Sequence, residues 1–212
     1  MKRDDTTAWG QITPALSNIH NWFASDDAFN NLYPPYIKEL AKSHWTPVEV
    51  ARKASNFLAA MPGDKILDIG SGPGKFCLSG AYYNPEVSFY GIEQRDDLVY
   101  CAAITKEMLG LNNVTFLNGN LLDLDFSQFD HFYFFNSFYE NLPGTDKIDN
   151  NLTYSRQLYN KYNRFLYKQL ENRPPGTRLV TYHGSEEEAP KGYQLAGSTN
   201  SQLLKCWIKA AY

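Results

Sequence analysis

Three glycines at alternate positions mark the segment Asp68-Ile-Gly-Ser-Gly-Pro-Gly-Lys75. The apolar run Lys65–Ile69 is typical of a buried strand, and a helix is expected to begin near Pro73 or Lys75 and to end near Tyr83. Glycines at such a turn allow a tight backbone and let a ligand touch the main chain. Because the first amides of the helix point at the loop, they favour a negative group there.

A carboxylate stands at the end of the next predicted strand. Val87–Ile92 is apolar enough for a buried strand, and Glu93 closes it. An acidic residue about 20 residues after a glycine loop reaches the two hydroxyls of a bound ribose. Ligands of open α/β sheets bind at the carboxyl ends of the strands, where both features lie. The pattern therefore predicts a cofactor that carries a nucleoside.

The glycine spacing narrows the choice of cofactor. Dinucleotide sites carry G-x-G-x-x-G, whereas this chain has D-x-G-x-G-x-G beginning at Asp68. A carboxylate at this place would repel a pyrophosphate but would suit a cationic ligand with a sulfonium and an ammonium group. The amides of the following helix would take the carboxylate of such a ligand.

Strands and helices alternate through the rest of the chain. Thr46-Pro47-Val48-Glu49 is a capping-box pattern that begins a helix ending at Pro62-Gly63. Asp96 or Asp97 is expected to cap the helix that follows the second strand, and Gly110 to stop it. Further predicted elements are strands at 114–117, 131–135 and 177–182, a helix at about 153–171, and a hairpin from 192–196 and 203–210. Alternation predicts a parallel sheet covered on both faces, and the hairpin adds an antiparallel edge.

In these motifs, over roughly Thr46 to Tyr182, the chain resembles the class I S-adenosylmethionine-dependent methyltransferases. The resemblance implies a three-layer, Rossmann-like α/β fold with a mostly parallel sheet of seven strands and an antiparallel C-terminal strand or hairpin. It implies S-adenosylmethionine as the cofactor, with the glycines at its methionine half, Glu93 at its ribose, and Gln94 and the segment 118–121 beside its adenine. The family often has Asp where this chain has Asn120, whose side-chain oxygen can still bond the adenine amine. The candidate cofactor-binding residues are Asp68, Gly70, Ser71, Gly72, Gly74, Glu93, Gln94, Asn120, Leu121 and Asn136.

The end of the fourth predicted strand faces the transferable methyl group in this fold. Asn136 is the polar residue there, and Phe138 and Tyr139 either wall an acceptor channel or pack the strand exit. Asn136 and Tyr139 are the catalytic candidates, and Tyr139 or Glu140 is a candidate to take a proton. The segment lacks the Asp/Asn-Pro-Pro-Tyr signature of enzymes that methylate adenine or cytosine amino groups. It has a weaker, local similarity to the non-SET histone-lysine methyltransferases.

Two segments after this strand have more than one interpretation. The polar loop 141–151 is either a lid over the acceptor or an ordinary connection. On the next helix, Arg156, Lys161, Arg164 and Lys168 form a basic stripe, either a solvated face or a surface for an acidic partner.

Composition limits the remaining possibilities. A net charge of −3 does not favour a nucleic-acid binder but does not exclude a basic patch. Three separated cysteines fit a reducing compartment, and four scattered histidines suggest no metal site. Without a signal-like or membrane-spanning apolar stretch, we expect a cytoplasmic protein. Residues 1–45 are expected to form an extension with short helices that caps the site of a domain at 46–212.

The sequence therefore predicts methyl transfer from S-adenosylmethionine to an unidentified acceptor, a nitrogen or oxygen of a protein, an RNA or a small molecule. Two alternatives remain: an NAD-dependent oxidoreductase, and a non-catalytic nucleoside-binding scaffold of the same fold.

Overall fold

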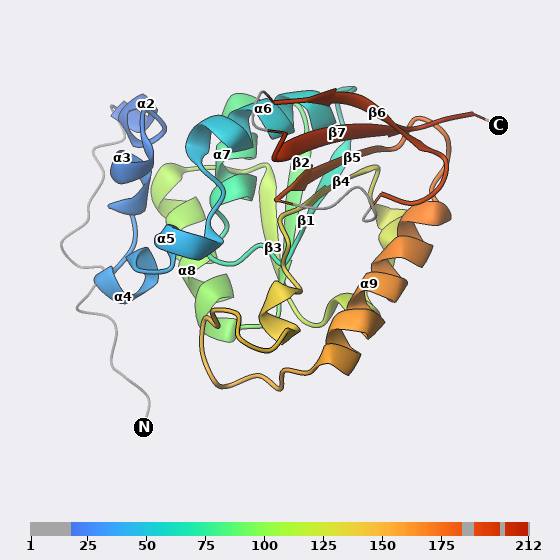
Figure 1. Ribbon diagram of the computed structural model, residues 1–212. Helices are drawn as coiled ribbons and strands as arrows, with labels where there is room; N and C mark the ends of the chain where they lie inside the picture. Colours follow the sequence, from blue (N-terminus) through green and yellow to red (C-terminus); the bar gives the residue numbers. More distant parts are fainter. Residues whose placement is uncertain (1–17, 184–188, 200–201, 212) are drawn as a thin grey trace.

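A seven-stranded sheet with the order β3-β2-β1-β4-β5-β7-β6 forms the centre of the molecule (Figure 1). The computed structural model describes residues 18–183, 189–199 and 202–211. Strands β1 to β5 pair in parallel, and β7 pairs antiparallel with both β5 and β6. The predicted three-layer, mostly parallel sheet with an antiparallel hairpin is confirmed.

The element bounds lie within a few residues of those expected from the sequence. The strands are β1 (Lys65–Ile69), β2 (Ser88–Glu93), β3 (Val114–Asn118), β4 (His131–Phe134), β5 (Arg178–Tyr182), β6 (Tyr193–Ser198) and β7 (Leu204–Lys209). The main helices are α6 (Val48–Leu58), α7 (Lys75–Tyr83), α8 (Asp96–Leu109) and α9 (Arg156–Glu171). Short 3-10 turns lie at η2 (Leu121–Asp123), η3 (Phe126–Gln128) and η4 (Tyr139–Asn141).

Alternating side chains of the strands feed two separate cores. On β4, Tyr133 joins the core under α6, α7 and α8, whereas its neighbours Phe132 and Phe134 join the core under α9. On β1, Ile66 joins the first core and Leu67 the second. This alternation follows from the two-residue period of a strand, so both faces of the sheet must be covered.

The predicted capping box at Thr46 is wrong. Its hydroxyl hydrogen-bonds the hydroxyl of Tyr133, 2.8 Å away, and caps nothing. The amide of Val48 at the start of α6 donates instead to the carboxylate of Asp26, from a segment far away in the sequence, at 2.9 Å. A local sequence pattern could not reveal this cap because its partner comes from the tertiary fold.

The predicted C-terminal cap of α8 is confirmed, whereas the predicted N-terminal cap is wrong. Arg95 occupies the N-cap position without a side-chain bond, so Asp96 and Asp97 belong to the first turn and neither caps the helix. There they still oppose the positive end of the helix dipole. Gly110 ends the helix in the left-handed conformation, with φ 64°.

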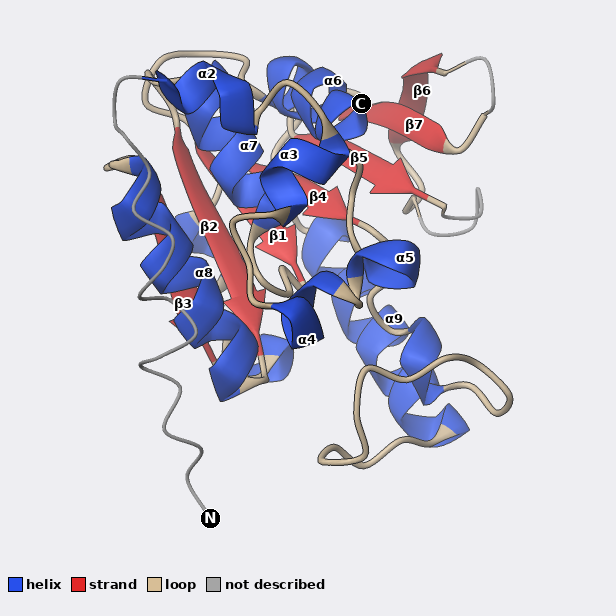
Figure 2. Cartoon of the chain, turned by 90° about the vertical axis from the view of Figure 1, so that its left-hand side faces the viewer, coloured by secondary structure: helices blue, strands red, loops and turns tan. Residues whose placement is uncertain are grey.

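The described part of the N-terminal extension is a chain of four short helices packed beside α7 and α8 (Figure 2). They are α2 (Ile19–Trp22), α3 (Asp26–Asn30), α4 (Pro35–Lys38) and α5 (Ala41–His44). The ammonium group of Lys75 at the start of α7 lies 2.5 Å from the carboxylate of Asp26 and 3.0 Å from the amide oxygen of Asn30. Residues 1–17, which the predicted extension also includes, lie outside the described residues.

The contact between α7 and the sheet gives a stability prediction. A Cβ added at Gly80 would lie 2.4 Å from the ring of Phe89, which is fully buried on β2. Gly80→Ala should therefore destabilise the fold by about 1–2 kcal/mol, because overpacking outweighs the gain in helix propensity. Urea unfolding measures the change. Gly197→Ala, whose Cβ would meet no atom within 4 Å, is the control. Equal stability of both variants would contradict this packing.

Candidate functional site

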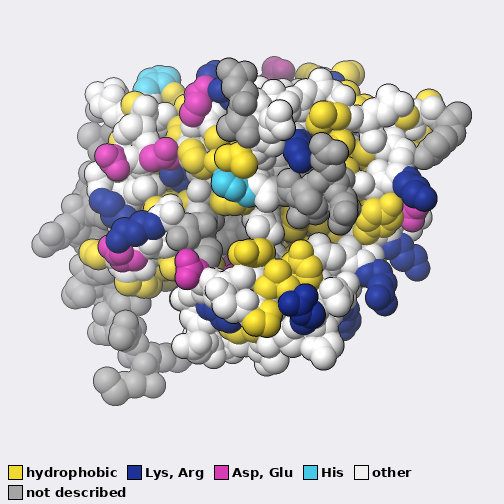
Figure 3. Space-filling view, in the orientation of Figure 1, with side chains coloured by type: hydrophobic (Ala, Val, Ile, Leu, Met, Phe, Trp, Pro, Cys, Tyr) yellow, Lys and Arg dark blue, Asp and Glu magenta, His cyan; other side chains and the backbone are white. Residues whose placement is uncertain are grey.

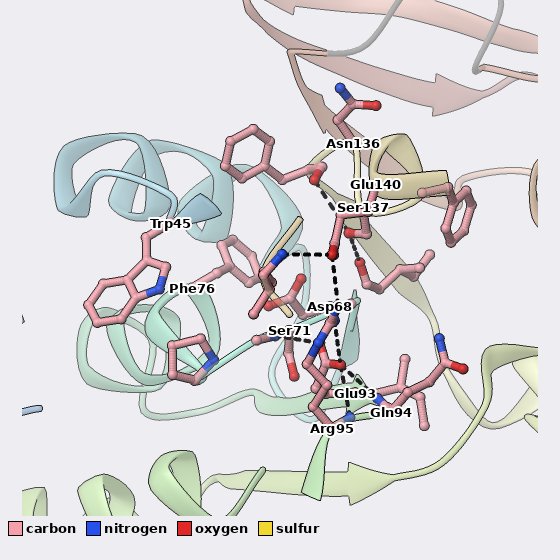
Figure 4. Close-up of a pocket in the computed structure, with 18 of the residues that line it drawn as sticks. Trp45, Asp68, Ser71, Phe76, Glu93, Gln94, Arg95, Asn136, Ser137 and Glu140 are labelled. Carbon is pink, nitrogen blue, oxygen red and sulfur yellow. Dashed lines mark hydrogen bonds and ion pairs between the residues drawn. The ribbon is translucent and has the colours of Figure 1, made fainter. Parts of the chain in front are cut away.

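A cavity of about 260 Å³ opens at the carboxyl ends of the parallel strands. Its walls come from the glycine loop after β1, the end of β2, the loop after β3 and the segment after β4. The N-terminal extension adds Leu40 and Trp45, and α9 adds Tyr162. In Figure 4, Trp45 lies on one side, Gln94 and Arg95 lie on the other, and Asn136 lies at the margin beyond Ser137.

The glycine loop is fastened to the neighbouring strand. The amides of Gly70 and Ser71 both donate to the carbonyl of Ile92 at 3.0 Å. Gly70 has φ 75°, and a Cβ there would collide with Ser137 at 2.5 Å. Gly72 has φ 53°, and a Cβ there would meet no atom within 4 Å. The first glycine therefore serves close packing, whereas the second exposes its backbone to the cavity.

Gly74 has a different place from the other two glycines. It is the left-handed N-cap of α7, and a Cβ there would press against the ring of Phe116 at 2.5 Å. It does not belong to the cavity wall, whereas Gly70 and Gly72 do. Its position explains the third glycine of the motif by helix packing.

Glu93 is the most heavily bonded carboxylate of the site. One oxygen accepts from the amide of Gly72 at 3.2 Å, and the other from the amides of Gln94 at 2.8 Å and Arg95 at 3.0 Å. Only 6% of Glu93 is exposed. Burial raises its pKa, and Arg95 and the three amides oppose that rise. The carboxylate is thus held at the cavity wall in one orientation.

Asp68 lies at the floor of the cavity with 4% of its surface exposed. Burial raises the pKa of this carboxyl to about 8, and the hydrogen bond from the Cys77 thiol at 3.6 Å opposes the rise. At neutral pH the group is therefore mostly protonated when nothing positive lies beside it. A cation in the cavity would favour its ionised form.

Arg95 joins the end of β2 to the loop after β4. Its guanidinium donates to Glu140 and Asp149, both at 2.7 Å, and to the hydroxyl of Tyr154 at 2.9 Å. The loop 141–151 borders the cavity through Asp146 and Ile148. Since Glu140 is bound by Arg95, it is a poor choice for the proton acceptor considered from the sequence.

The residues expected beside the adenine form a connected group. The amide nitrogen of Asn120 donates to the side-chain oxygen of Gln94 at 3.0 Å and to the hydroxyl of Tyr162 at 2.8 Å. Its oxygen accepts from the amide of Leu122 at 2.9 Å. Gln94 and Leu121 line the cavity, whereas Asn120 lies behind them. Asn120 thus orients the Gln94 side chain without lining the cavity itself.

The two catalytic candidates lie at the outer edge of the cavity. Asn136 lines it in the left-handed region, with φ 43°, a conformation that Asn tolerates better than most residues. Its side-chain amide points away from Asp68 in Figure 4. Tyr139 also lines the cavity and is 50% exposed. Phe138 is buried against Phe134 and Tyr162 and also lines the cavity, so its position agrees with both interpretations.

The cavity residues that the sequence analysis missed include Trp45, Lys75, Arg95 and Ser137. Lys75 directly follows the glycine motif, which was a usable signal. Ser137 fills the space that Gly70 leaves. Arg95 forms ion pairs with its neighbour Glu93 and with carboxylates from a distant segment of the chain. These roles depend on tertiary contacts that no local pattern carries.

Residues 61–209 match the family model described as a methyltransferase domain. The chain belongs to this methyltransferase family. The match covers more than half of the chain and confirms the predicted class I S-adenosylmethionine-dependent methyltransferase domain. The described helices include none that is long and apolar enough to cross a membrane. The same residues contain no group of three or more side chains suited to a metal ion.

Curated relatives match a short part of the chain. A tRNA (guanine-N(7)-)-methyltransferase of Microcystis aeruginosa is 49% identical over 55 residues, which are 26% of this chain and 26% of the relative. A Synechococcus protein of the same description is 47% identical over 55 residues, 26% of this chain and 23% of the relative. The chain thus spans about a quarter of the length of these relatives.

Solved structures share the fold over most of the chain. An RNA methyltransferase from Salinibacter ruber, in complex with S-adenosyl-L-homocysteine, has a TM-score of 0.55 and 22% identity over 79% of this chain and 95% of that chain. An O-methyltransferase from Thermotoga maritima has a TM-score of 0.53 and 16% identity over 84% of this chain and 72% of that chain. At these identities the likeness concerns the fold.

The buried carboxyl of Asp68 predicts a pH dependence of stability. Its pKa is near 3.9 in the unfolded chain and about 8 in the fold, so the folded state binds the extra proton between these values. Stability contributed by Asp68 therefore falls as pH rises from about 4 to 8. Asp68→Asn should remove this loss, and the variant should gain stability over the wild type towards pH 8, by at most about 5 kcal/mol.

Urea unfolding at pH 5 and pH 8 measures this difference. Asp27→Asn, at an exposed position in the first turn of α3, is the control. If Asp68→Asn follows the same pH profile as the wild type, the carboxyl is ionised in the fold and the account of Asp68 is wrong.

Proposed function

We propose that this protein transfers a methyl group from S-adenosylmethionine to a base nitrogen of RNA. The cofactor half rests on one observation: an exposed glycine backbone at Gly72 and a fixed carboxylate at Glu93 share a hydrogen bond at the wall of one cavity. The acceptor half rests on the charge of α9 and on the short similarity to tRNA methyltransferases.

The residues present fit S-adenosylmethionine. Glu93 would bind the ribose hydroxyls, and Gln94 and Leu121 would flank the adenine. The backbone at Gly70 and Gly72 would lie along the methionine half. Asp68 would face the positive end, and its pKa would fall as it ionises against that charge. The cofactor, when bound, supplies an electrophilic methyl group.

The chain's own contribution to the reaction is positioning. Methyl transfer is an in-line displacement, so alignment of acceptor and donor supplies much of the rate. Asn136 and Tyr139 stand at the edge where an acceptor would enter, and Asn136 would hold its nitrogen by a hydrogen bond. Glu140 takes no proton in this scheme because Arg95 holds its carboxylate at 2.7 Å. An aromatic ring nitrogen with a free lone pair requires no base before it attacks.

Helix α9 supports a polyanionic acceptor. It exposes Arg156, Lys161, Arg164 and Lys168, while its sequence contains a single acidic residue, Glu171. Figure 3 shows lysine and arginine side chains gathered along the edge where α9 runs. Tyr162 on the buried face of the same helix lines the cavity, so the helix that carries the basic stripe also borders the site. RNA phosphates bound along the stripe would bring a base towards Asn136.

Cofactor binding supplies the first test. Glu93→Gln keeps the shape of the side chain but removes the charge that pairs with the ribose hydroxyls, and it should weaken S-adenosylhomocysteine binding by about 1–3 kcal/mol. Calorimetry measures the affinity. Glu107→Gln, at an exposed residue of α8, should bind as the wild type does.

Two calorimetric outcomes would contradict the proposal. Wild-type affinity in Glu93→Gln would place the ribose elsewhere. Tight binding of NAD, without binding of S-adenosylhomocysteine, would favour the oxidoreductase, and failure of the folded wild type to bind either would favour the scaffold.

Charge reversal on α9 tests the acceptor. The double variant Lys161→Glu/Arg164→Glu should raise the KM for RNA about tenfold or more and flatten its salt dependence, because two phosphate contacts are lost. Affinity for S-adenosylhomocysteine should stay unchanged. Transfer of labelled methyl groups to total RNA, protein and small-molecule fractions provides the assay.

The matched control is Lys53→Glu/Lys106→Glu, which changes the same charge on α6 and α8. An equal rise in the KM for RNA in both double variants would show that the basic residues of α9 form an ordinary solvated face and not an RNA-binding surface. Label appearing in protein or small molecules, with none in RNA, would overturn the proposed acceptor.

A further inference from the structure

Two buried hydrogen-bond donors of the cavity wall have no partner within the part of the chain that the structure describes. They are the indole nitrogen Nε1 of Trp45 and the hydroxyl of Ser71. Trp45 is 6% exposed and Ser71 is 8% exposed, so solvent reaches neither side chain freely. Both residues line the cavity, and in Figure 4 the indole nitrogen of Trp45 faces the other lining side chains.

An unpaired buried donor needs an explanation. Leaving such a group without a partner costs about 1–3 kcal/mol, and most buried polar groups in native proteins avoid that cost. Tryptophan could be replaced by phenylalanine if the position required only an aromatic ring. The Ser71 hydroxyl fills the space that Gly91 leaves on β2, 2.5 Å from where a Cβ would lie, whereas the indole N–H of Trp45 faces the cavity. The orphan donor of Trp45 is therefore consistent with an acceptor that a ligand brings.

The charge around Trp45 indicates an anion. The ammonium of Lys75, a third lining group, is 4% exposed and lies 5.6 Å from the centre of the Trp45 ring. It has three donors, of which Asp26 and Asn30 take two. Lys75 also opens α7, whose N-terminal amides favour negative charge. This side of the cavity thus differs from the side lined by Asp68 and Glu93.

Trp45 is held in place by the N-terminal extension. The ring of Tyr33 packs edge-on against it, with 4.9 Å between centroids, and the Tyr33 hydroxyl donates to the carbonyl of Pro73 at 2.7 Å. Asp26 binds both Lys75 and the start of α6. The indole is therefore anchored to the glycine loop by contacts from outside the matched methyltransferase segment.

We infer that Trp45 Nε1, with the Lys75 ammonium beside its ring, binds the carboxylate at the amino-acid end of the cofactor. The inference rests on the proposed function, since it names the part of that ligand which this wall accepts. Asp68 would then meet the ammonium group of the same zwitterion. The extension is, on this account, a component of the cofactor site and makes the site selective for a ligand that retains its carboxylate.

Paired ligands test the inference. One is S-adenosylhomocysteine, and the other is its analogue in which hydrogen replaces the carboxylate. Trp45→Phe keeps the ring but removes the N–H, so affinity for S-adenosylhomocysteine should fall about tenfold, whereas affinity for the analogue should change less than twofold. Trp22→Phe makes the same substitution in the extension away from the cavity and should alter neither affinity.

A spectroscopic readout separates binding from packing. In protein labelled with ¹⁵N-tryptophan, the indole resonance missing from Trp45→Phe should move downfield when the wild type binds S-adenosylhomocysteine, and should move little with the analogue. Equal loss of both ligands in Trp45→Phe, or an unmoved resonance, would show a packing role and overturn the inference alone. A wild type that binds neither ligand would overturn the proposed function as well.

Discussion

The hydrogen bond from the Gly72 amide to the Glu93 carboxylate holds the centre of the site together. It joins the loop after β1 to the end of β2, two elements that are adjacent only because the strands pair in parallel. The carbonyl of Ile92 strengthens the same junction by accepting from Gly70 and Ser71. A carboxylate so deeply buried is stable only with several donors around it, and these donors also fix its direction. The geometry offered to a ligand is thus set before any ligand arrives.

The carboxyl groups of Asp68 and Glu93 lie beside the glycine loop, whereas the unpaired indole N–H of Trp45 lies on the side that the N-terminal extension forms (Figure 4). Arg95 connects Glu93 to the segment after β4 because it binds Glu93, Glu140 and Asp149 at once. The guanidinium of Arg95 therefore joins the loop that carries Asp149 to the end of β2. Removal of Glu93 or Asp149 should therefore disturb the other carboxylate's contact with Arg95, since removing one partner of a buried ion pair leaves the other charge uncompensated.

The sequence was sufficient to predict the fold and two carboxyl side chains, Asp68 and Glu93, that line the cavity. Local pattern and fixed spacing were enough to identify the run Lys65–Ile69, the alternate glycines and Glu93. Parallel pairing of the strands then brings these features together. The helix cap supplied by Asp26, the partnership of Gly70 with Ser137 and the hub at Arg95 depend on tertiary contacts between distant segments. The capping box at Thr46 misled for the same reason, because Tyr133 competes for its hydroxyl.

A crystal structure of the protein with S-adenosylhomocysteine tests the central claim most directly. The account predicts the ribose hydroxyls at the Glu93 carboxylate, with the amino-acid end of the ligand along the backbone between Gly70 and Gly72. Ligand density away from this glycine loop, or a ribose whose hydroxyls contact another side chain while Glu93 keeps its present bonds, would contradict it.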